Sequence, residues 1–145
     1  MNIRKMTISD YQQVYNLWMA CDGVGLNDID DSRQGVERFL DRNTETCFVA
    51  EDNGKVVGVI MAGHDGRRGF IYHTAVDLVY RRQKIGQNLV NQALEAIRKE
   101  GIVKVALLVF SNNYAANQFW EKQGFNARGD LTYRNKQLME MNKVK

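Results

Sequence analysis

The stretch from Ile71 to Gly101 constrains the fold most, because its apolar pattern changes in the middle. Residues 71–79 have the composition of a strand, and a short basic loop, Tyr80 to Gly86, follows them. After that, apolar residues recur every four positions, as on the buried face of an amphipathic helix. These residues are Ile85, Leu89, Ala93 and Ile97. Gly101 then ends the predicted helix.

A second apolar run lies directly behind this helix. Residues 102–110 are apolar at both alternating positions apart from Lys104. This pattern predicts a strand buried on both faces, as in parallel sheets. The whole stretch therefore predicts a β-loop-α-β unit.

The loop of this unit is suited to binding an anion. The first amides of a helix have no partner inside the helix and lie at the positive end of its dipole, and this loop adds two Arg, a Lys and a Gly. A pyrophosphate would fit such a loop. Basic residues before a helix are equally common in a solvated turn, so the loop alone leaves both interpretations open.

Two motifs together resemble a known family. Ala75-Val76 followed by Tyr80-Arg81-Arg82-Gln83-Lys84-Ile85-Gly86 resembles the acyl-CoA-binding motif of the GNAT superfamily of N-acyltransferases, whose loop runs Arg/Gln-x-x-Gly-x-Gly/Ala before a helix. Residues 113–125, NYAANQFWEKQGF, resemble the later helix of that family. The resemblance covers nearly the whole chain, and it is closest to small single-domain bacterial members with an Asp-Gly-x-Arg-Gly hairpin, here residues 65–69.

The resemblance implies an α/β fold with a mixed, mostly antiparallel central sheet and helices on both faces. Periodicity, capping residues and turn residues place the elements along a single domain, residues 1–145. They predict strands over 3–6, 47–51 and 55–63, helices over 11–20 and 33–42, a helix ending at Gly124, two strands over 125–138 and a frayed tail.

Composition excludes several other classes of protein. The chain has no run of about 18 apolar residues and no signal-peptide segment, so we expect it in the cytoplasm and not in a membrane. Cys21 and Cys47 are too far apart for a CxxC motif and are expected to be reduced thiols. His64 and His73 alone give no metal site. The net charge of +3 is small and forms no basic stripe with aromatic residues, which argues against nucleic-acid binding.

The resemblance also assigns residues to acetyl-CoA, the expected cosubstrate. The pyrophosphate would be held by the amides of the loop, which comprises Arg81, Arg82, Gln83, Lys84, Ile85 and Gly86. Val76 would offer backbone hydrogen bonds to the pantetheine or the acyl carbonyl, and Asn113 would contact the CoA arm. Lys84 stands where the family has its first glycine, and adds a charge that could reach a phosphate.

The catalytic positions depart from the family pattern. Trp120 stands where many members carry a tyrosine that protonates the departing thiolate, and an indole N–H is a poor acid. Members that use a general base often place Glu or His where this chain has Phe70 or Tyr72. Tyr72 ordering a water molecule is therefore the predicted substitute. His73 is one position out of phase, on the opposite face of the strand unless a bulge intervenes.

An acidic loop precedes the second helix. Its carboxylates, among them Asp28, Asp30 and Asp31, are typical of a solvated loop with helix-capping residues. In GNAT proteins this connection borders the acceptor site, so the resemblance implies that the three side chains attract a cationic amine.

The sequence therefore favours an N-acetyltransferase that moves an acetyl group from acetyl-CoA to a primary amine of a small molecule or peptide. The alternative is a catalytically silent acyl-CoA-binding sensor or interaction module, which Trp120 and Phe70 favour. A homodimer is possible through an edge strand near the C-terminus. A small nucleic-acid-binding domain is disfavoured by the distribution of charge.

Overall fold

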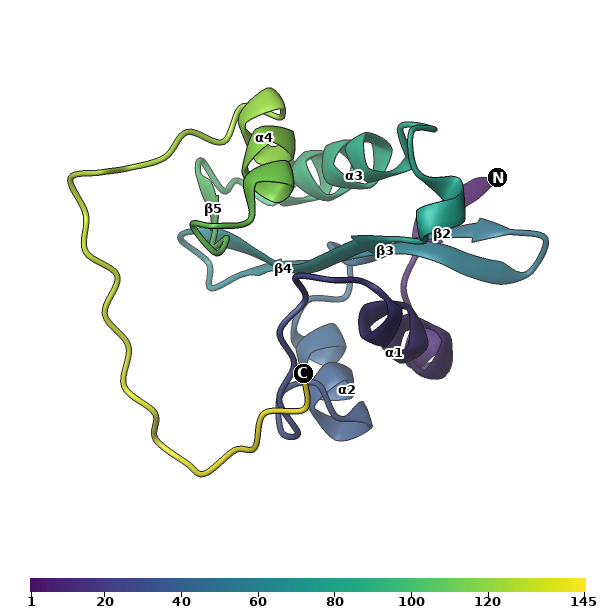
Figure 1. Cartoon of the computed structure of the whole chain (residues 1–145), viewed down its shortest axis with the longest axis horizontal. Helices are drawn as coiled ribbons and strands as arrows, with labels where there is room; N and C mark the ends of the chain where they lie inside the picture. The colour runs from purple at the N-terminus through teal and green to yellow at the C-terminus, as the bar shows by residue number, and fades with distance from the viewer.

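The computed structural model describes all 145 residues, and its centre is one five-stranded sheet (Figure 1). The strands follow one another across the sheet in chain order. The first four are antiparallel to their neighbours, and the last is parallel to the fourth. The strands are β1 (Asn2–Lys5), β2 (Phe48–Asp52), β3 (Lys55–His64), β4 (Gly69–Val76) and β5 (Val105–Leu107). The mixed, mostly antiparallel sheet predicted from the sequence is confirmed.

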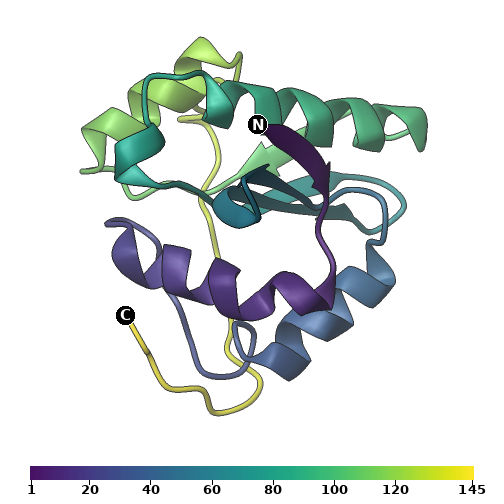
Figure 2. The same cartoon turned by 90° about the vertical axis from the view of Figure 1, so that its right-hand side faces the viewer.

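Helices cover both faces of this sheet, as predicted (Figures 1 and 2). One face carries α1 (Tyr11–Ala20) and α2 (Arg33–Arg42), and the other carries α3 (Ile85–Lys99) and α4 (Tyr114–Lys122). Each face has its own hydrophobic cluster, which includes Trp18 of α1 on one face and Leu89 of α3 on the other. None of the helices is long and apolar enough to cross a membrane.

Local residues explain where these elements begin and turn. Ser32 Oγ accepts a hydrogen bond from Gly35 N at 3.0 Å and so starts α2 at the predicted position. Asn53 and Gly54 adopt positive φ angles of 50° and 81°, which closes the predicted β2–β3 hairpin. The strand predicted over 71–79 ends earlier, because Asp77 accepts a hydrogen bond from Val79 N and turns residues 78–80 into a 3₁₀ helix.

The last strand is shorter and less buried than the sequence predicts. Only residues 105–107 pair with β4, and Val103, Leu108 and Phe110 are exposed. The prediction of a strand over 102–110 buried on both faces is therefore wrong. The physical reason is that β5 is the edge of the sheet, with no strand beyond it.

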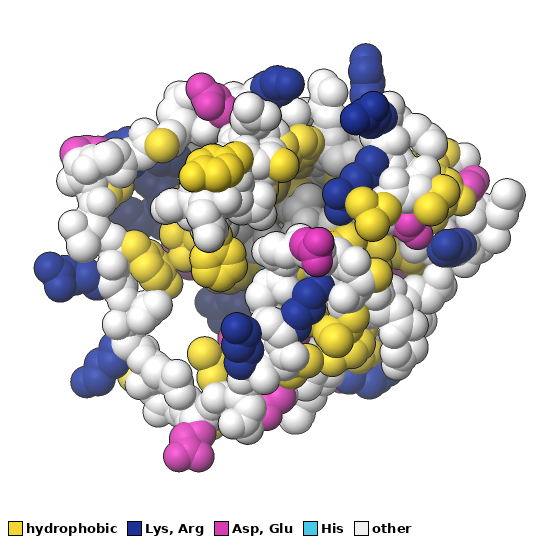
Figure 3. All heavy atoms as spheres, in the orientation of Figure 1, with side chains coloured by type: hydrophobic (Ala, Val, Ile, Leu, Met, Phe, Trp, Pro, Cys, Tyr) yellow, Lys and Arg dark blue, Asp and Glu magenta, His cyan; other side chains and the backbone are white.

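The C-terminal segment also departs from prediction. Residues 125–142 form neither helix nor strand, so the two strands predicted over 125–138 are absent. Leu131 and Tyr133, which lie in the second predicted strand, are exposed. Figure 1 shows the segment leaving α4 and returning to the loop between α1 and α2, and Figure 3 shows open space between it and the rest of the molecule.

The end of this segment is held in place and is not frayed as predicted. Val144 N donates to Leu26 O at 2.9 Å, and Asn142 N donates to Asp28 Oδ1 at 2.7 Å. Lys145 Nζ donates to the carbonyl oxygens at the end of α1, where a cation also complements the helix dipole.

Candidate active site

The basic loop lies between the end of β4 and the start of α3. Arg81, Arg82, Gln83 and Lys84 are all exposed. Arg81 Nε donates to the carbonyl oxygen of Val76 at 3.3 Å, which ties the loop to the last residue of β4. The Val76 carbonyl oxygen also accepts from Cys21 Sγ at 3.6 Å. The predicted loop residues therefore lie directly beside Val76.

Lys84 has a backbone conformation that glycine adopts without strain. Its φ angle is 63°, and that of Arg82 is 67°, in the left-handed region where a side chain costs about 1–2 kcal/mol. Lys84 is the N-cap of α3, and no side chain caps the helix there. The first amides of α3 are thus left without a side-chain partner beside four exposed polar residues, three of them cationic, which is an environment that fits a pyrophosphate.

Gly86 lets three elements meet beneath this loop. A Cβ atom there would stand 3.3 Å from Cζ of Phe119 in α4 and 3.7 Å from Cγ2 of Val76. Ile85, just before it, is buried against the α3 side of the sheet. Gly86 therefore packs the start of α3 against both β4 and α4.

The two parallel strands, β4 and β5, separate from each other next to the basic loop. β4 pairs with β5 only through Gly69, Phe70 and Ile71, so the remainder of β4 has no neighbour on that side. Thr74 lies in this unpaired part, opposite Ile60 of the α3-side cluster. Its Oγ1 atom is buried and has no hydrogen-bond partner. An unpaired strand edge with a buried, unsatisfied hydroxyl fits a ligand that carries amide groups, as pantetheine does.

The two remaining predicted residues on this side both belong to α4. Asn113 caps the helix, because its Oδ1 accepts from Ala116 N at 3.2 Å. A Cβ atom at Gly23 would lie 2.7 Å from Asn113 Nδ2, so the loop after α1 reaches the start of α4. Trp120 packs edge-on between Phe119 and Phe125, with ring centroids 5.0 and 5.2 Å away.

The predicted residue Tyr72 lies on the other face of the sheet from Trp120. It stacks edge-on against Phe39 of α2 at 5.5 Å and is about half exposed. Partial burial raises the pKa of the Tyr72 phenol, and the nearby negative charge of Asp30 raises it further. The phenol therefore stays protonated near neutral pH and can donate a hydrogen bond or order a water molecule.

A β-bulge changes the position of His73. The register between β3 and β4 shifts by one residue between the Ile60–Thr74 and Ala62–Ile71 pairs. Tyr72 and His73 consequently share the space opposite Met61 and both lie on the α1–α2 face. His73 packs edge-on against Trp18, with ring centroids 4.9 Å apart.

The three predicted acceptor carboxylates have three different partners. Asp28 accepts hydrogen bonds from Asn142, which lower its pKa. Asp30 is exposed and accepts from Asn27 Nδ2 at 3.0 Å. Asp31 is buried, and its Oδ1 lies 2.7 Å from His73 Nε2. Of the three, only Asp30 presents a carboxylate without a backbone or cationic partner.

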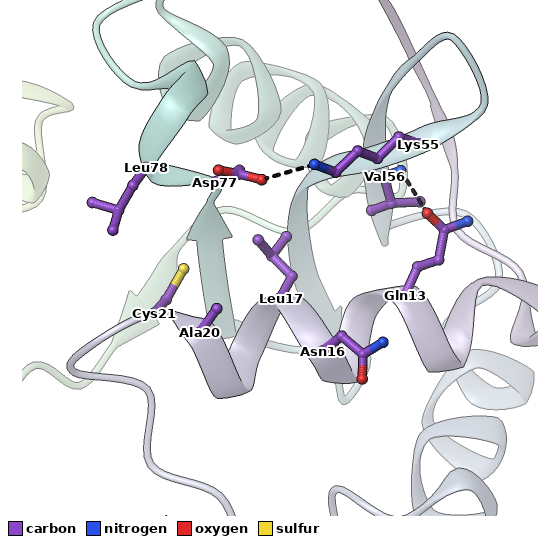
Figure 4. Close-up of a pocket in the computed structure, with 9 residues that line it drawn as sticks. All are labelled: Gln13, Asn16, Leu17, Ala20, Cys21, Lys55, Val56, Asp77 and Leu78. Carbon is purple, nitrogen blue, oxygen red and sulfur yellow. Dashed lines mark hydrogen bonds and ion pairs between the residues drawn. The ribbon is translucent and has the colours of Figure 1, made fainter.

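A shallow hollow of about 260 Å³ lies on the α1 side of the loop (Figure 4). It is bordered by Gln13 and Leu17 of α1, by Lys55 of β3 and by Asp77 after β4. Lys55 Nζ and Asp77 Oδ2 form an ion pair at 3.5 Å across it. None of the predicted site residues lines this hollow. No group of three or more His, Cys, Asp or Glu side chains is arranged to hold a metal ion.

Sequence reasoning missed two features of the site. The Asp31–His73 contact joins residues 42 positions apart, and no local pattern indicates it. The buried hydroxyl of Thr74, which has no partner, depends on packing around β4 that the sequence does not reveal. The only available signal for His73 was the possibility of a bulge.

Comparison with known proteins agrees with this geometry. The family model described as the acetyltransferase (GNAT) family matches residues 11–125. An acetyltransferase of Sodalis glossinidius (strain morsitans) is 32% identical over 140 residues, which are 97% of each chain. The chain therefore belongs to the GNAT family of acetyltransferases.

Solved structures share the fold at lower identity. Ard1 of Thermoplasma volcanium superposes with a TM-score of 0.78 at 24% identity, covering 88% of this chain and 84% of that one. The PaiA N-acetyltransferase of Thermoplasma acidophilum, in complex with coenzyme A, gives 0.75 at 19% identity, covering 88% and 90%.

Proposed function

We propose that this protein is an N-acetyltransferase that moves an acetyl group from acetyl-CoA to a primary amine of a small molecule or peptide. The observation that carries the proposal is the start of α3, which has no side-chain cap, carries Lys84 in the left-handed conformation and follows a basic loop. This anion site adjoins the part of β4 that β5 leaves unpaired.

Each element of the site would hold one part of the cosubstrate. The amides from Arg81 to Gly86 would bind the pyrophosphate, assisted by the Arg82 and Lys84 side chains. The unpaired part of β4, with Val76 and the Thr74 hydroxyl, would bind the pantetheine arm. Asn113 would face the same arm from α4. Most of the catalytic gain would then come from positioning the two substrates.

The acceptor would approach from the α1–α2 face. Tyr72, Phe39 and Phe70 form an aromatic wall there, and Asp30 supplies an exposed negative charge. This combination suits an amine that is cationic before it reacts and that carries an apolar body. We propose that residues 1–145 work as one domain, in the cytoplasm, without a metal.

A silent acyl-CoA-binding module is the second candidate, because of Trp120. Its indole is packed between Phe119 and Phe125 and offers no acid for a departing thiolate. A thiol with a pKa near 8.5 leaves as thiolate at modest cost, so the loss of this acid need not abolish transfer.

The experiment that separates the two candidates is an amine screen. The protein is mixed with acetyl-CoA and a panel of polyamines, aminoglycosides, amino acids and peptides with free N-termini, and thiol release is followed together with the mass of each amine. A gain of one acetyl group on an amine supports the proposal. Binding of acetyl-CoA without acetylation of any amine supports the silent module.

A further inference from the structure

A histidine and a buried carboxylate face each other on the acceptor side of the sheet. His73 Nε2 lies 2.7 Å from Asp31 Oδ1. The second oxygen, Asp31 Oδ2, accepts a hydrogen bond from Asn27 N at 2.8 Å, so both oxygens of the carboxylate have a partner. The Asp31 side chain is 7% exposed and that of His73 is 21% exposed. The imidazole is therefore held by a buried group and remains reachable from outside.

The contact exists because of the bulge in β4. In a regular strand, side chains alternate between the two faces, so His73 would lie on the face opposite Tyr72, away from Asp31. With the bulge, His73 lies beside Tyr72 and three residues before Val76, the residue proposed to face the acyl group. The ring has one nitrogen on Asp31, and its Nδ1 makes no hydrogen bond within the chain.

We propose that His73 is the general base that deprotonates the acceptor amine, and that Asp31 is the residue that positions it. The inference rests on the proposed function and deepens it, because it assigns the base that the sequence left to Tyr72. Asp31 acts on the imidazole and does not bind the amine.

The chemistry of the acceptor requires such a group. An alkylamine with a pKa near 10.4 is neutral in about one molecule in a few thousand at pH 7. His73 Nδ1 takes one proton from the ammonium group. The freed nitrogen lone pair then forms the C–N bond. The C–S bond breaks at the same time, and the electron pair of the C–S bond goes to sulfur. The thiolate takes a second proton from the nitrogen, and His73 releases the first to solvent.

The carboxylate contributes in two ways. It fixes which ring nitrogen carries the hydrogen, since Nε2–H donates to Asp31 and Nδ1 keeps its lone pair. It also compensates the positive charge that the ring gains when it accepts a proton. Trp18, fully buried, packs edge-on against the ring and limits its rotation.

Other titratable groups, on several segments of the chain, surround this pair. Tyr11 of α1 donates its hydroxyl to Asp31 O at 2.7 Å. Burial raises the pKa of Tyr11, and the Tyr15 phenol and the Asp31 charge raise it further, while Arg33 opposes this. Tyr72 has a raised pKa too, so both phenols stay neutral where an imidazole titrates. Asp30 on the acidic loop and Tyr133 on the C-terminal segment act on Tyr72.

The chain contains its own control pair. His64 Nε2 lies 2.8 Å from Glu100 Oε1, nearly the same distance, but the Glu100 side chain is 39% exposed and the pair lies at the end of the sheet where β3 turns into β4. His64 Nδ1 also accepts from Gly66 N at 3.0 Å, so neither of its nitrogens is free. The geometry therefore assigns a base role to His73 and a structural role to His64.

The test compares His73→Gln, Asp31→Asn and His64→Gln with the wild-type protein. The first readout is the pH profile of kcat/KM with the best amine of the screen. The second is the NMR titration of the imidazoles, which needs no acceptor; only two histidines are present, and His64→Gln assigns them. The third is acetyl-CoA affinity, which reports that each variant is folded.

If the proposal is right, the acid limb of the wild-type profile coincides with the His73 titration, and His73→Gln loses about 100-fold or more in kcat near pH 7. Asp31→Asn lowers kcat without changing KM for the amine, because the imidazole has lost the group that holds its orientation. His64→Gln changes neither. Acetyl-CoA affinity stays the same in all three.

A His73→Gln variant that keeps the rate and the acid limb overturns the proposal and leaves the proposed function standing. So does an acid limb in the wild-type protein that does not match the His73 titration. Failure of the proposed function itself would appear earlier, as a wild-type protein that acetylates no amine.

Discussion

Gly86 and Phe119 are in such close contact that a side chain on the glycine would meet the aromatic ring at 3.3 Å. This contact joins the first turn of α3, where we propose the anion site, to the middle of α4. The glycine therefore allows the two helices to pack closely at the start of α3, where we propose that a phosphate binds.

Substitution of Gly86 by a small residue should therefore lower the stability of the fold through the packing of α3 against α4. Gly86→Ala is expected to lower the free energy of unfolding by about 1 kcal/mol, because the neighbours must shift by a few tenths of an ångström. Phe119→Leu should relieve part of that cost in the double variant, which urea denaturation of all four proteins would measure. Strict additivity would show that the two residues do not press on each other.

The left-handed conformation of Lys84 predicts opposite effects on stability and binding. Lys84→Gly should raise the free energy of unfolding by up to about 1 kcal/mol, because glycine adopts a φ angle of 63° without strain. The same substitution should weaken acetyl-CoA binding several-fold through the lost charge.

Asn53→Gly is the matched control for Lys84→Gly. Asn53 also has a positive φ angle, but it lies in the β2–β3 hairpin turn. It should alter stability without changing acetyl-CoA affinity. Equal effects of the two substitutions on binding would contradict a role for the Lys84 charge.

An ion pair between Arg4 of β1 and Asp10, just before α1, predicts sensitivity to acid. Burial acts to raise the pKa of Asp10, but hydrogen bonds from Arg4, at 2.8 and 2.9 Å, and from Thr7 N outweigh it and leave the pKa below its ordinary value. A lowered pKa stabilises the fold above about pH 4 and loses that contribution as pH falls through the value in the folded protein.

Asp10→Asn should therefore cost about 2 kcal/mol at pH 7 and progressively less below pH 4. Urea denaturation at several pH values would measure the difference between variant and wild type. A difference that is the same at pH 7 and at pH 3 would contradict the assignment.

The C-terminal residues are held to the acidic loop by Asp28, so removal of this carboxylate should speed amide hydrogen exchange near the C-terminus. Asp28 holds Asn142 by two hydrogen bonds, so Asp28→Ala should speed amide exchange at Val144 several-fold. Asp130→Ala, which removes a carboxylate bonded only to exposed Arg128, should leave that amide unchanged. Unaltered exchange in both variants would show that the end is held by other contacts.

Most helices and the β2–β4 meander could be predicted because their signals are local. Ser32 caps α2, Asn53 and Gly54 turn a hairpin, and a four-residue apolar period marks α3. Each signal lies within a few residues of its effect. The match of two motifs extended this to the family and the position of the loop.

The exposed edge strand and the Asp31–His73 contact could not be predicted, because their signals are not local. An apolar run such as 102–110 has the same composition whether or not a neighbouring strand covers it. The bulge at Tyr72 and His73 depends on the register with β3, and the Asp31–His73 contact depends on that bulge. Such features follow from contacts across the fold that no single stretch encodes.

The most direct test of the central claim is calorimetric titration of acetyl-CoA into the wild-type protein, Lys84→Glu and Lys104→Glu. Lys84 precedes α3 and Lys104 precedes β5, and both side chains are exposed. The proposed site predicts micromolar binding to the wild type and to Lys104→Glu, with a loss of about tenfold or more in Lys84→Glu. Absence of binding to the wild-type protein, or equal affinity in all three, would contradict an acetyl-CoA site at the start of α3.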